Sequence, residues 1–271
     1  MSTTGTRLFR WHGGDLTPLE HCDPGETRIL AADSWLVSDG NTLAIDLHRD
    51  RFFAAVERQQ PAPAAELALG DFWSAAIAAI PRVGDQFPRV ELQLLRDAPM
   101  LVLRQRPAPE LKLSVTVTSH PGADPRSQPT IKGPDTTALL HARTQAQQRG
   151  ADEAIILSPE GFIVEGAYSA MLWWRGGILC APSPELERVD SVTARSVIAL
   201  ATALGVDVHY ESVAPDALDG LEVWALSALH GIRIVTAWVD GPALAEEPGR
   251  LSNWRARLDR LRKPPPARPA R

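Results

Sequence analysis

Short runs in which apolar and polar residues alternate dominate the first half of the chain. Such runs are typical of half-buried β-strands, and they predict strands over 28–32, 36–37, 43–47, 90–95, 101–105 and 113–118. Two segments, 48–58 and 71–80, have apolar residues at helical spacing instead, and the second opens on Asp71 and stops before Pro81. The first half is therefore predicted to be an α+β domain.

In the second half, helical and strand-like patterns follow one another. Helices are predicted over 136–149 and 193–204, each closed by a glycine, Gly150 and Gly205. Strands are predicted over 153–157, 162–165, 170–174, 178–180, 206–210, 222–226 and 234–238. The segment 121–131 is rich in proline and glycine and poor in apolar residues, which is typical of a linker.

These patterns predict an α/β (α+β) fold with two domains. The smaller N-terminal α+β domain spans 1–120, the linker spans 121–131, and a larger mixed-sheet domain spans 132–262. The proline-rich segment 263–271 is predicted to be a disordered tail.

The composition excludes several classes of protein. With 44% hydrophobic residues, 23% charged residues and a net charge of -5, the chain lacks the basic excess of a nucleic-acid binder. Two cysteines, Cys22 and Cys180, make neither a disulfide framework nor a metal site and favour a reducing compartment. No leader pattern and no apolar run near the ~18 residues of a membrane span is found. We therefore expect a cytoplasmic protein without nucleic-acid, membrane or metal partners.

Lysine is rare in this chain. Of 28 basic residues only Lys112, Lys132 and Lys263 are lysines, and the other 25 (28 − 3) are arginines. An arginine cannot replace a lysine that must lose its proton, and a neutral amine can form a Schiff base. Because Lys112 begins a strand pattern and Lys263 opens the tail, Lys132 is the candidate reactive amine.

Other polar residues suit a phosphate-bearing cofactor. Backbone N–H groups at a helix start bind phosphate, and Ser191, Val192 and Thr193 lie at such a start. A pyridoxal ring also needs a carboxylate beside its nitrogen, and Glu165 follows an apolar run and precedes Gly166. Taken singly, each has a plainer interpretation: a solvated strand end for Glu165 and ordinary helix residues for Thr193 and Arg51.

Together these residues resemble the class IV aminotransferases, which include branched-chain and D-amino-acid aminotransferases and aminodeoxychorismate lyase. Residues 150–154 (Gly-Ala-Asp-Glu-Ala) are similar to the family's Gly-x-Asp-Glu-Ala, and 161–166 to its Gly-x-x-x-Glu-Gly. Glu165 follows Lys132 by 33 positions (165 − 132), in the family's order. Residues 191–194 correspond to the Gly-Ile-Thr-Arg phosphate turn, 48–52 to His-x-x-Arg-Leu, and 222–229 to a strand ending in a last phosphate turn.

The resemblance implies a homodimeric pyridoxal 5'-phosphate (PLP) enzyme with a two-domain class IV fold, acting on a small molecule. Lys132 would be the catalytic lysine and Glu165 the ligand of the ring nitrogen. The implied phosphate ligands are Arg51, Ser191, Val192, Thr193, Ser227 and Ala228. His230 and Arg233 are candidates either for binding a substrate carboxylate or for a satisfied core or interface pair.

The lyase branch resembles this chain best. Aminotransferases of the family usually have a tyrosine shortly after the lysine, where this chain has Asp135-Thr136-Thr137, whereas the lyase branch lacks that tyrosine and has a Leu-Phe-Trp run comparable to 171–173. Residues 33–37 occupy the positions at which members of the family normally have residues on the substrate side of the site. We therefore expect a 4-amino-4-deoxychorismate lyase of folate biosynthesis that releases 4-aminobenzoate and pyruvate.

Two alternatives remain. A transaminase would use the same lysine to move an amino group from an amino acid to a 2-oxo acid. A catalytically idle binding module is the third reading, and the retained set of Lys132, Glu165 and Arg51 argues against it.

Overall fold

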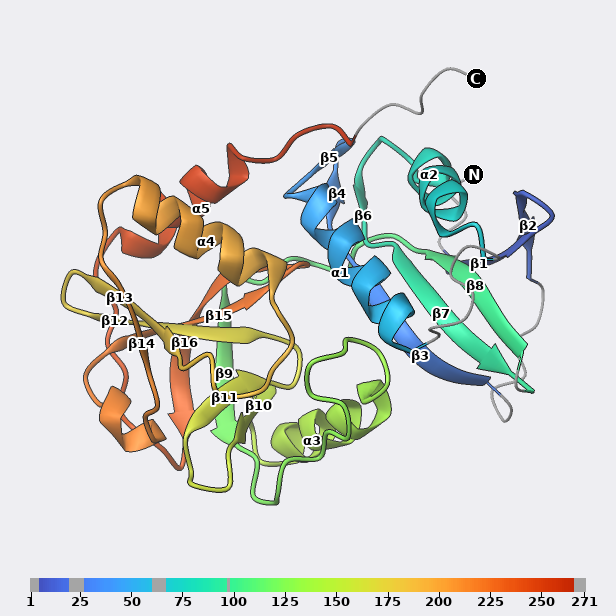
Figure 1. Ribbon diagram of the computed structural model, residues 1–271. Helices are drawn as coiled ribbons and strands as arrows, with labels where there is room; N and C mark the ends of the chain where they lie inside the picture. Colours follow the sequence, from blue (N-terminus) through green and yellow to red (C-terminus); the bar gives the residue numbers. More distant parts are fainter. Residues whose placement is uncertain (1–4, 20–26, 60–66, 97, 266–271) are drawn as a thin grey trace. The chain divides into compact units, whose positions relative to one another are not determined.

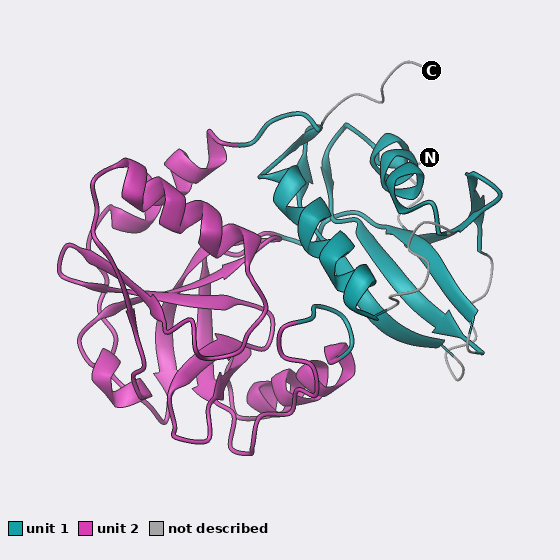
Figure 2. Cartoon of the chain, viewed as in Figure 1, with its two compact units in different colours: residues 1–110, 131–134, 262–271 teal, residues 111–130, 135–261 magenta. Residues whose placement is uncertain are grey.

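The computed structural model describes residues 5–19, 27–59, 67–96 and 98–265 (Figure 1). The chain forms two compact units (Figure 2): unit 1 comprises 1–110, 131–134 and 262–271, and unit 2 comprises 111–130 and 135–261. The short segment that carries Lys132 thus belongs to unit 1, while the chain on either side of it belongs to unit 2. This division differs from the predicted one, which placed Lys132 at the start of the second domain.

Unit 1 is built on a five-stranded antiparallel sheet with the strand order β2-β1-β8-β7-β3. Its strands are β1 (Arg7–His12), β2 (Asp15–Pro18), β3 (Thr27–Ser34), β7 (Arg89–Leu95) and β8 (Ala98–Gln105). A small sheet of order β5-β4-β6 joins β4 (Val37–Ser38), β5 (Asn41–Thr42) and β6 (Asp85–Gln86). The helices are α1 (Ile45–Gln59) and α2 (Leu69–Ala79). The strand predicted over 43–47 is wrong, because α1 begins within it.

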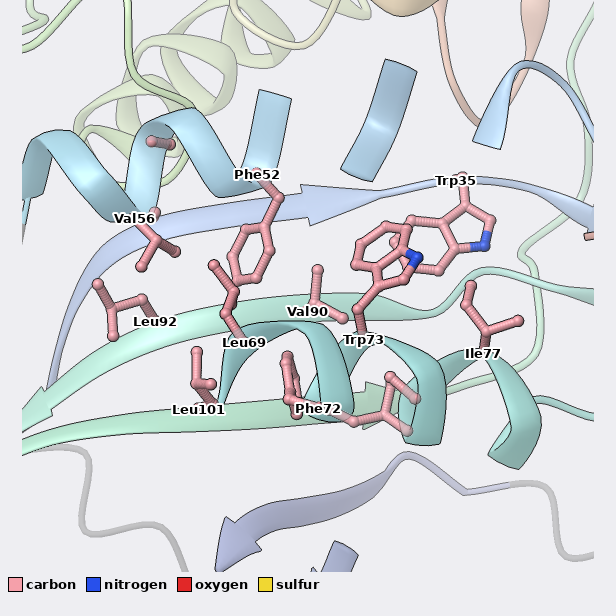
Figure 3. Packing of buried hydrophobic residues seen from close by; sticks show 14 of the residues in the cluster. Trp35, Phe52, Val56, Leu69, Phe72, Trp73, Ile77, Val90, Leu92 and Leu101 are labelled. Carbon is pink, nitrogen blue, oxygen red and sulfur yellow. The ribbon is translucent and has the colours of Figure 1, made fainter. Parts of the chain in front are cut away.

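The two faces of β7 and β8 differ in character. Val90, Leu92 and Leu101, all at most 1% exposed, pack with Phe52 of α1 and Phe72 of α2 (Figure 3). Burying such side chains stabilises a fold by roughly 1.5–3 kcal/mol each. Successive side chains of a strand point to opposite faces. Of the residues that alternate with this core, Met100 and Val102 are apolar and buried, whereas Arg89, Glu91, Gln93 and Arg104 are polar.

Unit 2 contains an eight-stranded mixed sheet of order β11-β10-β9-β16-β15-β12-β13-β14. The strands are β9 (Ser114–Ser119), β10 (Glu153–Leu157), β11 (Ile163–Gly166), β12 (Ala170–Arg175), β13 (Ile178–Pro182), β14 (Val208–Glu211), β15 (Glu222–Ser227) and β16 (Gly231–Val239). The helices are α3 (Thr136–Gln148), α4 (Val192–Ala203) and α5 (Arg250–Asp259), with a 3₁₀ turn η1 (Pro215–Leu218). Val117, Ile155, Trp173 and Val223 are fully buried in its core. The mixed α/β class is confirmed.

The predicted linker and the predicted tail both contain residues held by hydrogen bonds. In the predicted linker, Asp135 accepts hydrogen bonds from the backbone N–H groups of Ser127 and Gln128, both at 2.9 Å. In the predicted tail, Lys263 exchanges two backbone hydrogen bonds with Thr42, at 2.8 and 2.9 Å. Cys22 and residues 266–271 lie outside the described residues. Within the described part of the chain, no helix has the length and apolar character needed to cross a membrane.

Candidate active site

Lys132 lies beside the edge strand β3 of unit 1. Its carbonyl oxygen accepts a hydrogen bond of 2.7 Å from the backbone N–H of Ala32. The next residue, Gly133, has φ of 131°, and a Cβ atom there would lie 2.8 Å from the Ala32 nitrogen. Only glycine tolerates both this backbone conformation and this close approach. The backbone on which the Lys132 side chain is mounted is therefore fixed against β3.

Asp33, the next residue on β3, forms a buried charged cluster with His48 and Arg51 of α1. Asp33 is 0% exposed and His48 is 2% exposed. Arg51 holds Asp33 with two hydrogen bonds, from Nε to Oδ2 at 2.7 Å and from Nη2 to Oδ1 at 2.9 Å. His48 Nδ1 lies 2.7 Å from Asp33 Oδ1. His48 and Arg51 reach the same carboxylate because residues three apart share a helix face.

The protonation of this cluster follows from its burial. Burial raises the pKa of Asp33, but the charges of Arg51 and His48 and their hydrogen bonds outweigh it and hold the pKa well below its usual range. Burial lowers the pKa of His48 below 6.5, and Arg51 and Lys132 lower it further against the opposing effect of Asp33. His48 is therefore largely neutral at pH 7 and donates its Nδ1 proton to Asp33.

In unit 2, Glu165 is the last residue but one of β11 and is 7% exposed. Arg126 Nη1 donates a short hydrogen bond to Glu165 Oε1. The Arg126 side chain, 3% exposed, also binds Asp124 through Nε to Oδ1 at 2.8 Å and through Nη2 to Oδ2 at 2.6 Å, and it donates to the Glu187 carbonyl at 3.1 Å. Burial acts to lower the pKa of Arg126, but Asp124 and Glu165 raise it overall. A buried cation therefore accompanies the buried carboxylate, as burial of charge requires.

The predicted phosphate turns lie at the same end of the unit 2 sheet as Glu165. Ala170, which begins β12 just after the β11 end, pairs with Leu226 near the end of β15, so Ser227 and Ala228 follow at that end. Because β13 runs antiparallel to β12, the chain also leaves β13 there to enter α4. A cleft of about 530 Å³ opens beside this helix start, lined by Ala170, Leu172, Pro182, Arg188, Ser191 and Ala194 among others.

The start of α4 is capped in the ordinary way. Ser191 Oγ accepts a hydrogen bond of 3.3 Å from the Ala194 backbone N–H, and Val192 and Thr193 are each 2% exposed. At the end of β15, Ser227 Oγ accepts a 3.2 Å bond from the His230 backbone N–H. A helix start of this kind presents backbone N–H groups and the positive end of the helix dipole, both of which attract anions.

The two candidates for a substrate carboxylate have other partners. Arg233 is 4% exposed, and its Nη2 donates to Glu153 Oε2 at 2.8 Å. His230 Nδ1 accepts from the Lys112 backbone N–H at 3.2 Å, and burial, together with Arg233 and other cations, lowers the pKa of His230 to about 4. A neutral histidine and a paired arginine favour the core-pair interpretation.

Sequence reasoning did not assign roles to Asp33, His48 or Arg126. His48 was visible only as the first letter of a His-x-x-Arg motif, and Arg126 lay in a segment whose lack of apolar residues indicated a linker. In each case the signal is a buried partner distant in sequence, 15 residues apart for His48 and Asp33 and 39 for Arg126 and Glu165.

Comparison with known proteins gives a family match and a fold match. The family model for amino-transferase class IV matches residues 30–238. A branched-chain aminotransferase structure from Thermoproteus uzoniensis with norvaline is 19% identical, with a TM-score of 0.78 and coverage of 94% of each chain. A putative 4-amino-4-deoxychorismate lyase from Legionella pneumophila is 17% identical, with a TM-score of 0.75 and coverage of 87% of this chain and 91% of the other.

A third structure, the PLP-bound form of a hypothetical aminotransferase from Mycobacterium tuberculosis, is 18% identical with a TM-score of 0.72, covering 95% of this chain and 98% of the other. At these identities the solved structures establish the fold. No curated protein matches the sequence.

Proposed function

Because this chain belongs to the class IV aminotransferase family, whose members are PLP-dependent enzymes, we propose that Lys132 carries the cofactor here and that the enzyme converts 4-amino-4-deoxychorismate to 4-aminobenzoate and pyruvate. The placement of Lys132 is the observation that carries the proposal. Its backbone is fixed by Ala32 and Gly133, and Ala32 precedes Asp33, the carboxylate that binds His48 and Arg51.

The donor set suits PLP. Asp33 orients the Arg51 guanidinium from one side, as expected of an arginine that binds phosphate. The N-terminus of α4 at Ser191, Val192 and Thr193 and the turn at Ser227 and Ala228 supply further phosphate donors. Glu165 supplies the carboxylate that favours a proton on the ring nitrogen.

When bound, PLP supplies an electron sink for the carbon next to the substrate amine. The neutral amine of Lys132 removes the proton from that carbon and later returns a proton. Loss of the enolpyruvyl group as pyruvate leaves the aromatic product, so the overall reaction needs no second substrate. Arg51 and Glu165 bind and orient, and they exchange no proton with the substrate.

The residue after the lysine segment supports the lyase over a transaminase. Asp135 stands in the region where family aminotransferases usually have a tyrosine. Its carboxylate is occupied by the backbone of Ser127 and Gln128 and by Ser127 Oγ at 2.7 Å. Asp135 therefore has a structural role next to the lysine segment, and it does not provide the phenol group of the tyrosine found in the aminotransferases.

The first experiment tests the cofactor. The protein incubated with PLP should show visible absorbance that borohydride fixes, and mass spectrometry should find the reduced cofactor on the peptide containing Lys132. Lys132→Ala should lose this absorbance, whereas Lys112→Ala, at a lysine whose side chain is 57% exposed, should keep it. A wild type that stays colourless with added PLP contradicts the proposal.

The second experiment tests the reaction. The loaded enzyme is given 4-amino-4-deoxychorismate alone, and pyruvate is measured with lactate dehydrogenase. Pyruvate release without an amino acceptor supports the lyase. Amino transfer that requires an amino acid and a 2-oxo acid, without pyruvate release, would instead identify a transaminase. The homodimer implied by the family resemblance is tested by sedimentation of the same preparation.

A further inference from the structure

Strand β16 of unit 2 begins before the strand β9 that it pairs with. The two strands are parallel, and their pairing starts where Ile234 of β16 meets Ser114 of β9. β16 itself starts at Gly231, three residues earlier (234 − 231). The first residues of β16 therefore extend past the end of β9 and need other partners for their backbone groups on that side, because buried backbone groups are almost always paired.

The guanidinium of Arg255 in α5 provides that partner. Its Nη1 donates a hydrogen bond of 2.8 Å to the His230 carbonyl and a short one to the Ile232 carbonyl. Ile234, the next residue but one, donates its N–H to the Leu113 carbonyl at 3.0 Å. Backbone groups of alternate strand residues face the same side, so Arg255 continues the pairing of β16 at the point where β9 has ended.

Aromatic packing fixes the helix that carries Arg255. Trp254, the preceding residue, is 5% exposed. Its ring centroid lies 5.3 Å from that of Trp174 in β12 and 5.8 Å from that of Trp224 in β15. Leu258, one turn further along α5, is also buried. Because such rings bury a large apolar surface, α5 is held firmly against the sheet and gives Arg255 a fixed base.

The carbonyls that Arg255 holds belong to the turn that contains the proposed phosphate donors. Ala228, Leu229 and His230 join β15 to β16, and Gly231 follows with a φ of 66°, which glycine adopts without steric cost. In the part of the chain that the structure describes, the backbone N–H groups of Ala228 and Leu229 donate no hydrogen bond. Neighbouring N–H groups of a turn bind anions, so these two suit a phosphate.

We propose that Arg255 is a positioning residue for the cofactor phosphate. By holding the carbonyls of His230 and Ile232, it keeps the preceding turn in one conformation, with its N–H groups already arranged for an anion. Donors that are ordered before binding give a higher affinity than donors that must be ordered by the ligand. The proposal rests on the phosphate role proposed for Ser227 and Ala228. It extends the phosphate site to the C-terminal helix.

PLP and pyridoxal, which lacks the phosphate, together test this role. The affinity of the cofactor-free protein for each is measured by the quenching of tryptophan fluorescence. Arg255→Met should weaken PLP binding by about tenfold, because a hydrogen bond from a charged donor contributes roughly that much. It should leave pyridoxal binding unchanged. Arg255→Lys, which keeps the charge and a donor but loses the planar guanidinium, should lose less of the preference for PLP.

Arg257→Met is the matched control. Arg257 lies on the same helix, is exposed, and its guanidinium lies 5.9 Å from the ring centroid of Trp254. It should bind PLP and pyridoxal as the wild type does. If Arg255→Met weakens both ligands equally, Arg255 only stabilises the fold, and if it weakens neither, Arg255 has no part in binding. Either outcome overturns the inference.

The wild type separates this inference from the proposed function. A wild type that binds PLP no more tightly than pyridoxal contradicts the proposed phosphate site, and the role of Arg255 fails with it. A wild type that prefers PLP, together with an Arg255→Met variant of equal preference, contradicts the role of Arg255 alone. If Arg255→Met does not fold, the ratio of the two affinities in Arg255→Lys decides, and a ratio equal to that of the wild type overturns the inference.

Discussion

Replacing Asp33 by asparagine keeps the shape of a fully buried side chain and removes its charge. The variant therefore tests whether an ionised carboxylate holds Arg51 in place. In the wild type, Arg51 donates two hydrogen bonds to Asp33, and the Arg51 side chain is only 15% exposed. Losing one member of a buried ion pair costs about 3–5 kcal/mol, because the other charge stays buried. We expect the free energy of unfolding of the cofactor-free protein to fall by roughly that amount.

The measurement is urea unfolding followed by tryptophan fluorescence. Asp50→Asn is the control. Asp50 lies on α1, the helix that carries Arg51, is 62% exposed and pairs with the exposed Arg49. An exposed pair contributes at most about 1 kcal/mol. If Asp33→Asn destabilises the protein no more than Asp50→Asn does, the buried ion pair does not hold Arg51, and the electrostatic reasoning is wrong.

The same variant reports on phosphate. If Arg51 binds the cofactor phosphate, that phosphate supplies a negative charge beside the guanidinium. The deficit of Asp33→Asn should then be smaller with PLP or inorganic phosphate than without. A deficit that neither anion changes would contradict the phosphate role of Arg51 while leaving the ion pair intact.

Acid should remove the difference between wild type and Asp33→Asn. The pKa of Asp33 is lower in the folded protein than its ordinary value of 3.8. The folded state therefore binds fewer protons than the unfolded chain, and the stabilisation is complete above about pH 4 and declines below it. The two proteins should differ less at pH 3 than at pH 7.

Three further predictions concern single side chains. Gly133→Ala should cost at least about 1–3 kcal/mol and lower cofactor attachment, whereas Gly176→Ala, at a positive φ but in open space, should leave attachment unchanged. Arg126→Met should destabilise the protein by about 3–5 kcal/mol and weaken PLP binding at least tenfold, while Arg149→Met, at a side chain 37% exposed, should cost less than about 1 kcal/mol; denaturation and PLP titration measure both. His230 has a folded pKa of about 4 against an ordinary 6.5, so stability should fall as pH drops through that window, and His230→Asn should flatten the decline in pH-dependent thermal melts.

Two helices of unit 2, α3 and α4, were predicted because their sequence signals are local, whereas α5 (Arg250–Asp259) was not predicted. The helix predicted over 136–149 is α3 (Thr136–Gln148), and that over 193–204 is α4 (Val192–Ala203). Each has a regular apolar spacing and a glycine just after its end. The pattern over 43–47 was ambiguous between a strand and a helix. Ile45 has strand spacing with Leu43 and Leu47, and it has helical spacing with His48 and Phe52. The helix prevails, since Ile45, His48 and Phe52 are all buried on one face of α1.

In the candidate site, Arg51 and Glu165 were proposed from family motifs, and Lys132 from the rarity of one residue type. Lys132 stood out because lysine is rare in the chain. Arg126 did not, because the segment around it is ordered by polar contacts, among them Asp135 with Ser127 and Arg126 with Glu165, and these leave no apolar period. Hydrophobic patterning detects segments that bury apolar side chains and cannot detect segments held by side-chain hydrogen bonds.

In both buried ion clusters, one charged side chain orients another of opposite charge. Around Arg51 the carboxylate of Asp33 orients the cation, and around Glu165 the guanidinium of Arg126 orients the carboxylate. Buried pairs add little net stability compared with apolar packing, but they fix a charged group in one direction. That direction is what a phosphate or a ring nitrogen requires of its ligand. The clusters therefore make sense as preorganisation, which implies that conservative replacement of Asp33 or Arg126 should weaken cofactor binding more than equal destabilisation of the apolar core would.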